Sequence, residues 1–394
     1  MPVLDGIRVI DASRILAGPH CGQMLADNGA EVIKVEAIEG DQNRKWPPIA
    51  DGAGVSFLSV NRGKQGISLN LKHPKGQELL RKLVATADIY IQNFLPSVTS
   101  RLGTDYETLN RVNPDLIYVS ITGFGTRGPM RDHPGFGAMA AAFSGIMHMT
   151  GEPDGPPLNP GIPVADMATS ILAYAGAVTA LVARMSGKAR GQRVDVSLLE
   201  TSVAMLAPTA MNWMIAGQQP HREGAFNTKL APYGPYHCKD GDIMIGVTND
   251  GVWRKFCQGI GAAALANDPR FTTNELRCDN RTELRKRLEA VLEQATIEQW
   301  FGRLAETGVA CSPINTVEGV CSHEQVLAND MIIRVPRRDG GTMPLIGLPL
   351  KLSATPGEPG KAPPSLGEDT DGVLQRILAL DNDALATLHR EGVI

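Results

Sequence analysis

IRVIDASRILAGPHCGQMLADNGAEVIKVEA, residues 7–37, is the stretch that decides the fold of this chain. It begins and ends with short runs rich in Val and Ile, at 7–13 and 31–37. The segment between them contains HCGQMLADNGA, which has the length and composition of a helix. A strand, a helix and a second strand in this order predict a βαβ unit with two parallel strands.

The same alternation continues along the chain. Strand-like runs at 67–71, 88–94 and 115–121 alternate with helical segments at 73–87 and 105–113. Strands and helices that alternate at this spacing predict a mostly parallel, doubly wound sheet, so the expected fold class is α/β. Such sheets bind ligands at the carboxyl ends of their strands.

A change of composition marks a second unit. The segment 217–232 is polar and carries Pro and Gly, as linkers do. It precedes a strand at 242–248 and charged amphipathic helices that end near residue 325. The Pro- and Gly-rich segment 355–372 then leads into a helical tail. It is either a flexible linker or an extended strap that carries the tail back over the first domain.

Composition excludes several classes of protein. The 394 residues are 43% hydrophobic, enough for a large core, and their net charge of −4 without basic blocks argues against nucleic acid as main partner. The six cysteines show no C-x-x-C and no zinc spacing, so we expect reduced thiols, a cytoplasmic location and no metal. Residues 1–12 contain acids within an apolar run and are typical of a first strand rather than a signal peptide. Met167–Ala183 is shorter than the roughly 20 residues of a membrane span, so we expect a buried helix.

Two motifs suggest cofactor or phosphate binding. GFGTRG at 123–128 fits G-x-G-x-x-G, but Pro129 and Pro134 follow where a dinucleotide fingerprint would open a helix. We therefore expect no nicotinamide site there, and take Glu36, at the place of a ribose-binding acid, for a surface residue. Basic residues also lie near the strand ends of the first domain. They are either scattered surface charges or a set that binds a phosphorylated ligand: Arg62, Lys64, Lys72 and Arg101.

Asp166 stands at the head of an apolar helix, in GIPVADMATS. One interpretation is helix capping, because a carboxylate in the first turn accepts N–H bonds and is favoured by the helix dipole. The other is catalysis, since the helix end would keep Asp166 ionised and an ionised carboxylate can act as a nucleophile. No G-x-S-x-G offers a serine nucleophile instead. The pattern alone leaves both interpretations of Asp166 open.

Ordered blocks over nearly the whole chain resemble the class III CoA-transferase family, which includes formyl-CoA transferase, carnitine CoA-transferase and related acyl-CoA racemases. The blocks are RVIDASRILAGPHCGQMLADNGAEVIKVE, NRGKQGISLNLKHPKGQELL, ADIYIQNFLPSVTSRLG, NPDLIYVSITGFGTRGP, TGEPDGPPLNPGIPVADMATS, SGKARGQRVDVSLLE and PPSLGEDT. The resemblance implies a Rossmann-like large domain built from both chain ends, a smaller α/β domain and two interlocked subunits in a homodimer. The domains would be 1–216 and 217–325, with 326–394 returning to complete the large domain.

The resemblance also implies a site and a mechanism. Asp166 matches the nucleophilic aspartate, which forms a covalent aspartyl-CoA thioester while CoA passes from a donor acyl-CoA to a small carboxylic acid. The substrate is then coenzyme A as acyl-CoA, with no permanently bound cofactor. The resemblance, or position within the matching blocks, assigns eight residues to the CoA site. They are Leu16, Ala17, Lys72, Asn93, Phe94, Arg101, Gly135 and Phe136. Further candidates for the pocket wall are His20, Tyr233 and Tyr236.

The two alternatives to CoA transfer are a racemase and a CoA-binding protein without catalytic activity. A racemase needs a histidine opposite the acid, but Phe136 and Gly137 stand where that branch has His and Asp, and His133 is three residues away. A CoA-binding protein without chemistry is disfavoured by the intact GIPVADMATS. Ala37 and Leu16 depart from formyl-CoA transferase, and NTKLAPYGPYH replaces its glycine-rich loop. We therefore expect a short-chain or dicarboxylic donor such as succinyl-CoA rather than oxalate chemistry.

Overall fold

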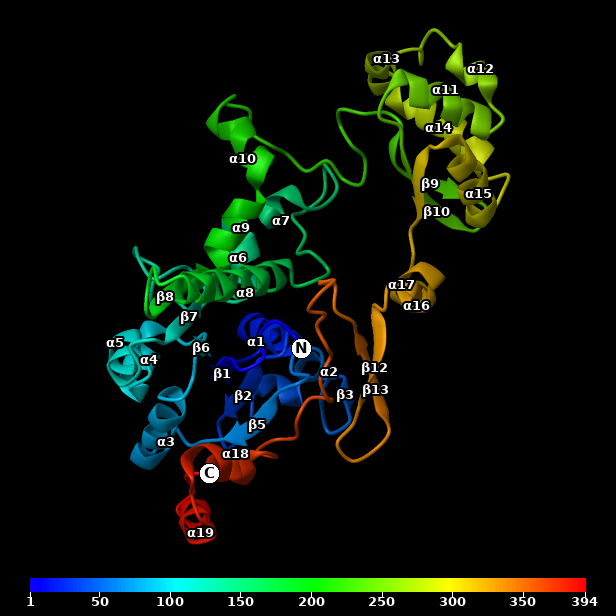
Figure 1. Cartoon of the computed structure of the whole chain (residues 1–394). Helices are drawn as coiled ribbons and strands as arrows, with labels where there is room; N and C mark the ends of the chain where they lie inside the picture. Colours follow the sequence, from blue (N-terminus) through cyan, green and yellow to red (C-terminus); the bar gives the residue numbers. More distant parts are fainter. The chain divides into compact units, whose positions relative to one another are not determined.

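The computed structural model describes residues 1–394, the whole chain, and contains two compact units. The large unit comprises residues 1–146, 159–211 and 325–394, and the small unit comprises 147–158 and 212–324 (Figure 1). This division departs from the expected boundaries in one respect, because 147–158 belongs to the small unit. That excursion lies in a Pro- and Gly-rich stretch to which the sequence analysis gave no boundary.

A six-stranded parallel sheet forms the centre of the large unit. Its strands are β1 (Arg8–Asp11), β2 (Glu31–Glu36), β5 (Gln65–Ser68), β6 (Ile89–Gln92), β7 (Ile117–Thr122) and β8 (Gln192–Ser197). Their order is β5-β2-β1-β6-β7-β8, and every neighbouring pair is parallel. This is the doubly wound order of Rossmann folds, which confirms the predicted α/β class. The order reverses between β1 and β6, so ligands are expected beyond the carboxyl ends of these two strands.

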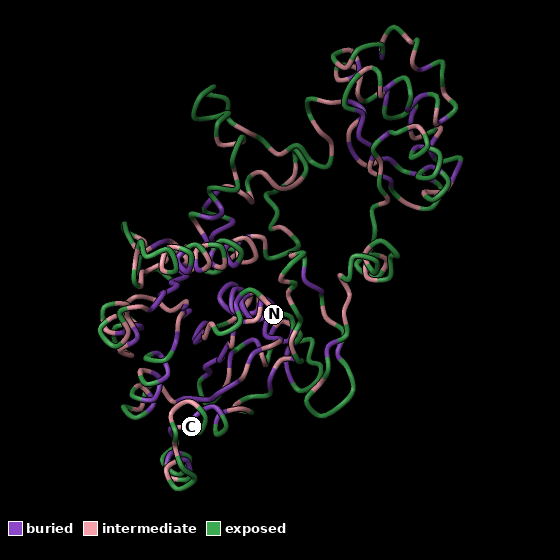
Figure 2. The backbone as a smooth tube through the Cα atoms, in the orientation of Figure 1, coloured by how far each residue is buried: buried purple, intermediate pink, exposed green.

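Apolar side chains alternate between the two faces of this sheet, as strand geometry requires. Val9 packs into one core with α1 (Ala17–Asp27) and α8 (Val164–Met185). Its neighbour Ile10 packs into the other core. The helices of that second core are α3 (Pro74–Val84), α5 (Tyr106–Val112), α18 (Thr370–Leu378) and α19 (Asn382–Arg390). The central strands β1, β6 and β7 are almost entirely buried, whereas the edge strand β8 is only partly buried (Figure 2).

The last part of the chain is tied to the edge strand β5. The backbone N–H of Gly66 donates to Asp369 at 2.7 Å, and that of Ser68 donates to the Thr370 hydroxyl at 3.0 Å. Gly63 donates to the carbonyl of Lys361 at 2.8 Å. The Pro-rich segment is thus an extended strap along the large unit, and it covers a sheet edge that would otherwise lie open.

Shorter elements complete the large unit. They are η1 (Gln42–Lys45), β3 (Ile49–Ala50), β4 (Ala53–Gly54), α2 (Val55–Leu58), α4 (Pro96–Leu102), α6 (Gly137–Ser144), α9 (Leu198–Met205), β12 (Ile332–Pro336) and β13 (Thr342–Ile346). Strand β8 ends at Ser197, whose side chain caps α9. Helix α6 ends before Gly145 and α9 ends before Ala207, and both of these residues have positive φ.

The small unit contains a three-stranded antiparallel sheet, β11-β10-β9, with helices packed on it. Its elements are β9 (Tyr233–Cys238), β10 (Gly241–Gly246), α11 (Asp250–Gly259), α12 (Ala263–Ala266), α13 (Asn274–Asp279), α14 (Arg281–Leu292), α15 (Ile297–Thr307), β11 (Ala310–Pro313) and α16 (Val317–Ser322). At the edges of the two units lie α7 (Ile146–Met149), α10 (Ala207–Met214) and α17 (Glu324–Ala328). Arg277 is fully buried in the small unit, where its guanidinium donates to the carbonyls of Ala231 and Phe271 and to Asp250.

Helix α8 has 22 residues, so it is longer than the run Met167–Ala183 for which a buried helix was expected, and part of its surface is exposed. By length and composition alone it could cross a membrane, a test that core helices of globular proteins also pass. Ala173, Ala177 and Ala180 are buried on its inner face, which contacts α1. These small residues allow the two helices to pack closely.

Candidate active site

A cavity of about 310 Å³ lies at the point where the strand order reverses. The loop after β1 and the loop after β6 form two of its walls, and the carboxyl end of β7 forms a third. Asp166, from the first turn of α8, completes the lining. The lining residues are Arg14, Ile15, Leu16, Ala17, Gln42, Asn93, Phe94, Leu95, Val98, Ile121, Thr122, Gly123, Pro134, Gly135, Phe136, Asp166 and Leu198. The cavity therefore occupies the position at which doubly wound sheets bind ligands.

The Asp166 carboxyl is partly buried and has no cationic partner. Burial raises its pKa to about 6, from an ordinary value of 3.8. The sequence analysis expected the helix end to favour the charged form, but desolvation outweighs the N–H groups of the first turn. At neutral pH Asp166 is still mostly ionised. An ionised carboxylate with few solvent contacts has the properties of a nucleophile.

Gly137, the first residue of α6, lies directly against this carboxylate. A Cβ atom at position 137 would overlap Oδ2 of Asp166. Asp166 also lines a second cavity, of about 240 Å³, together with Gly137, Ala138, Ala141 and residues 159–165. Asp166 thus lines two cavities, and the absence of a side chain at Gly137 leaves room for its present orientation.

Comparison with known proteins agrees with this geometry. The sequence pattern of CoA-transferase family III matches residues 4–370. The chain belongs to CoA-transferase family III. Succinyl-CoA:glutarate CoA-transferase of Mus musculus is 36% identical over 100% of this chain and 91% of its own. Succinate–glutarate CoA-transferase of Agrobacterium fabrum is 39% identical over 97% of this chain and 98% of its own.

A solved structure supports the same membership. A CaiB/BaiF family protein from Brucella suis is 37% identical and has a TM-score of 0.89, over 95% of this chain and 99% of that one. The protein is therefore an enzyme that transfers CoA, with acyl-CoA and a carboxylic acid as its substrates. The fold and the family confirm the resemblance on which the sequence analysis relied.

Most of the residues predicted for the CoA-transferase site line the Asp166 cavity. These are Leu16, Ala17, Asn93, Phe94, Gly135 and Phe136. Gly135 is required by close packing, since a Cβ there would come within 2.7 Å of the Cα of Gly123. Lys72 and Arg101 are exposed on the same unit and do not line the cavity. Their contact with CoA stays a prediction.

Two other predicted cations are structural. Arg62 is 3% exposed and binds Asp27 with two bonds of 2.8 and 2.6 Å. Lys64 is 1% exposed and lies 2.8 Å from Asp11. A buried charge requires such a partner, so neither residue is available to a phosphate group, and the phosphate-binding interpretation is wrong for both. Glu36 is likewise buried rather than exposed, and Arg44 binds both of its carboxylate oxygens.

None of the additional residues expected in the pocket wall, His20, Tyr233 and Tyr236, lines either cavity beside Asp166. His20 is largely buried, and its Nδ1 lies 2.6 Å from the Ser170 hydroxyl; burial lowers its pKa to about 4. Tyr236 packs in the core of the small unit. His133 is exposed, and neither cavity beside Asp166 is lined by a histidine. The arrangement therefore offers no second proton-transfer histidine of the racemase kind.

Arg14 is a site residue that the sequence analysis missed. It is the one basic residue that lines the Asp166 cavity, and its guanidinium lies 4.7 Å from the centre of the Phe94 ring. Its position in the loop after the first strand could have indicated a site role, because ligands bind at such loops.

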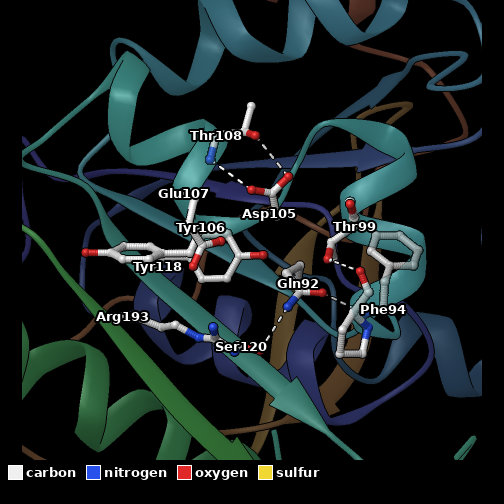
Figure 3. Close-up of a pocket in the computed structure, with 12 residues that line it drawn as sticks. Gln92, Phe94, Thr99, Asp105, Tyr106, Glu107, Thr108, Tyr118, Ser120 and Arg193 are labelled. Atoms are coloured by element: carbon white, nitrogen blue, oxygen red, sulfur yellow. Dashed lines mark hydrogen bonds between the residues drawn. The ribbon is translucent and has the colours of Figure 1, made fainter. Parts of the chain in front are cut away.

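Phe94 also lines a third cavity, of about 440 Å³ (Figure 3). Its lining residues are Gln92, Phe94, Pro96, Thr99, Ser100, Asp105, Tyr106, Glu107, Thr108, Tyr118, Ser120 and Arg193. Arg193, its one basic residue, pairs with Asp195 at 2.8 Å, and Asp105 and Glu107 add negative charge. This cavity therefore does not suit the phosphates of CoA, although it is larger than the one at Asp166.

Proposed function

We propose that this enzyme moves CoA from a dicarboxylic acyl-CoA, such as succinyl-CoA, to a carboxylic acid through a covalent thioester on Asp166. The observation that carries the proposal is the Asp166 carboxylate, partly buried, without a cation and lining the cavity at the switch point. The activities named for the mouse and Agrobacterium relatives support succinyl-CoA as donor.

In the first half of the reaction, a carboxylate oxygen of Asp166 attacks the thioester carbonyl of the donor. The carbon–sulfur bond breaks, CoA leaves as a thiolate, and donor and Asp166 are joined in a mixed anhydride. The thiolate then attacks the Asp166 carbonyl carbon and expels the donor acid as a carboxylate. The product on the enzyme is an aspartyl-CoA thioester.

The second half reverses these steps with the acceptor. The acceptor carboxylate attacks the aspartyl thioester, which forms a second mixed anhydride and releases the CoA thiolate. The thiolate attacks the acceptor carbonyl, so that a new acyl-CoA leaves and the Asp166 carboxylate is restored. One thioester replaces another, and the exchange needs no net input of energy.

Arg14 provides a positively charged group that can bind the second carboxylate of a dicarboxylic substrate. Its guanidinium lines the cavity that contains Asp166, and no carboxylate of the chain pairs with it. Guanidinium groups bind carboxylates through charge-assisted hydrogen bonds. We assign to Arg14 the distal carboxylate of the acyl group, and to the exposed Lys72 and Arg101 the phosphates of CoA.

A homodimer is also part of the proposal. Apolar side chains are exposed on α6, α8 and α9 of the large unit: Met139, Phe143, Ile171, Leu172, Val182, Met185, Val203 and Met205. Apolar surface of this extent is typical of interfaces between proteins. We place the enzyme in the cytoplasm, a proposal supported by its six free cysteines.

Mass spectrometry of the intact protein tests the covalent step. After mixing with succinyl-CoA, the wild-type protein should gain the mass of CoA less one water, and peptide mapping should locate the adduct at Asp166. Asp166→Asn should form no adduct and transfer no CoA. The matched control is Asp383→Asn, which removes an exposed acid from the first turn of α19 and should behave as wild type.

Two outcomes would contradict the proposal. Full transfer by Asp166→Asn would exclude the nucleophile. Exchange of the α-proton of a branched acyl-CoA with deuterium from solvent, without any adduct, would replace transfer by racemase chemistry.

A further inference from the structure

The loop after β1 is held almost entirely by side chains. In three consecutive residues, Ser13, Arg14 and Ile15, every backbone N–H and C=O bonds to a side chain. One partner is the nearby Asp11, and the other five bonds come from residues 21 to 79 positions away. The Ser13 N–H donates to Asp11 at 3.0 Å, and the Ser13 carbonyl accepts from Lys34. The Arg14 N–H donates to the Asn93 side chain and the Arg14 carbonyl accepts from it, at 2.8 Å each. The Ile15 N–H donates to Asp41 at 2.9 Å, and the Ile15 carbonyl accepts from Asn43 at 2.6 Å. Loops rarely have their backbone groups bonded so completely by side chains, since backbone partners dominate in proteins.

Ile15 is the residue that needs this support. Its φ is 71°, in the left-handed region, where a β-branched side chain is strained. Asp41 and Asn43 bond the N–H and C=O of this one residue. Strained residues of this kind persist only where the surroundings determine the backbone, and they gather at functional sites.

The two supporting residues are themselves fixed and cannot reach a substrate. Asp41 is 2% exposed and Asn43 is 0% exposed. The Asp41 N–H donates to Glu36 at 2.9 Å, and Arg44 binds the same Glu36 carboxylate with two bonds of 2.7 Å. Lys34 lies 3.6 Å from Asp41 and balances its charge. The support therefore extends back to strand β2.

The loop leads directly into the reaction cavity. Leu16 and Ala17, the next two residues, line the same cavity as Asp166. Leu16 is the N-cap residue of α1 and Ala17 is its first residue. No side chain caps this helix, so the N–H groups of its first turn have no side-chain partner. A rotation of the Ile15 backbone would move this wall of the cavity relative to Asp166.

We propose that Asp41 and Asn43 are positioning residues for CoA transfer. They hold Ile15 in its left-handed conformation, and this conformation places Leu16 and Ala17 opposite Asp166 for the thioester to bind between them. The inference rests on the proposed function of Asp166. It concerns two residues that never touch the substrate and act only through Ile15.

The test is Asn43→Ala, which removes the single donor to the Ile15 carbonyl. We expect kcat to fall by about 10- to 100-fold, more than KM changes, because a small misplacement of the cavity wall carries such a cost. Ile15 itself lines the cavity, so its substitution is read as a cycle: Asn43→Ala should cost much less kcat in an Ile15→Gly background than in the wild type, since glycine adopts positive φ without support. Asp41→Asn should lower kcat in the same direction.

The matched control is Asn28→Ala. Asn28 is also a buried asparagine that donates to one backbone carbonyl, that of Met24 at 2.8 Å, but it lies away from the cavity. This variant should lose stability and keep the wild-type kcat. An equal loss of kcat in Asn28→Ala, or an equal cost of Asn43→Ala in the wild-type and Ile15→Gly backgrounds, would overturn a role through Ile15.

Hydrogen exchange separates this inference from the proposed function. Without substrate, the peptide that spans Ser13–Ala17 should exchange faster in Asn43→Ala than in wild type, and unchanged exchange would overturn the inference. If the wild-type enzyme forms no adduct on Asp166, the proposed function fails. If it transfers CoA and Asn43→Ala keeps the wild-type kcat, the positioning inference alone fails.

Discussion

Replacing Asp166 by Asn is expected to stop CoA transfer and also to stabilise the folded protein at neutral pH. Burial raises the pKa of Asp166 to about 6, from 3.8, so ionisation of this carboxyl is less favourable in the folded protein than in the unfolded chain. One pKa unit corresponds to about 1.36 kcal/mol, and the ionised carboxylate therefore lowers the free energy of unfolding by about 3 kcal/mol. Asparagine has nearly the same shape and no charge, so it removes this cost.

The gain in stability should depend on pH with a defined sign. The unfolded chain loses the Asp166 proton near pH 3.8, whereas the folded protein keeps it up to about pH 6. Between these values the stability of the wild-type protein falls relative to Asp166→Asn as pH rises, and above them the difference is constant. The advantage of the variant should be full above about pH 6 and should disappear as pH falls towards 4.

Urea unfolding at several pH values measures this difference. Asp383→Asn, which removes an exposed first-turn acid of α19, is the control for the loss of one negative charge. The reasoning is refuted if Asp166→Asn is less stable than wild type at alkaline pH. It is also refuted if the gain is the same at all pH values, because the cause would then lie outside the titration of Asp166.

Four further outcomes are expected. The kcat/KM for succinyl-CoA should fall tenfold per pH unit below about pH 6, because Asp166 must be ionised to attack, and a flat profile to pH 5 would contradict this. Gly137→Ala should lower kcat by about 100-fold, because its Cβ displaces the Asp166 carboxylate; wild-type turnover would show that the site accommodates the methyl group. Arg14→Gln should raise KM for succinyl-CoA by about 10- to 100-fold and leave that for acetyl-CoA nearly unchanged, and equal effects on both would remove its role in selecting a dicarboxylic group. Arg62→Met should destabilise the fold by about 3–5 kcal/mol in urea unfolding, because Asp27 loses its partner, with KM for CoA thioesters unchanged.

The parts of the structure that local patterns determine could be predicted from the sequence. Strand β1 carries Val9 and Ile10 on opposite, buried faces of the sheet, and its apolar pattern is visible in residues 7–13 alone. The alternation of strands and helices predicts a parallel sheet but not the order of its strands. The reversal of that order, which places the loops after β1 and β6 at the site, comes from the structure. Asp166 was identified as a candidate because its position at the head of α8 is also a local feature.

Pairings between distant residues could not be predicted. Arg62 and Lys64 have the same appearance in the sequence whether they face solvent or a buried carboxylate, and Asp27 is 35 residues away from Arg62. Asn93 was predicted to line the CoA site, which it does, but its side chain also bonds both backbone groups of Arg14, 79 residues away. The positive φ of Ile15 has no signal in the sequence, because isoleucine is among the residues least suited to it.

Three departures from local preference lie in or beside the Asp166 cavity. Ile15 holds a strained backbone, which typically costs about 1–3 kcal/mol. Asp166 is buried without a cation, and Gly137 gives up a side chain to make room for it. Each feature lowers stability. Ile15 positions the loop, Asp166 is the proposed nucleophile, and Gly137 leaves the space that the carboxylate needs. Stability gained at any of these positions should therefore be accompanied by lost turnover, whereas stability gained in the sheet or in the strap should leave turnover unchanged.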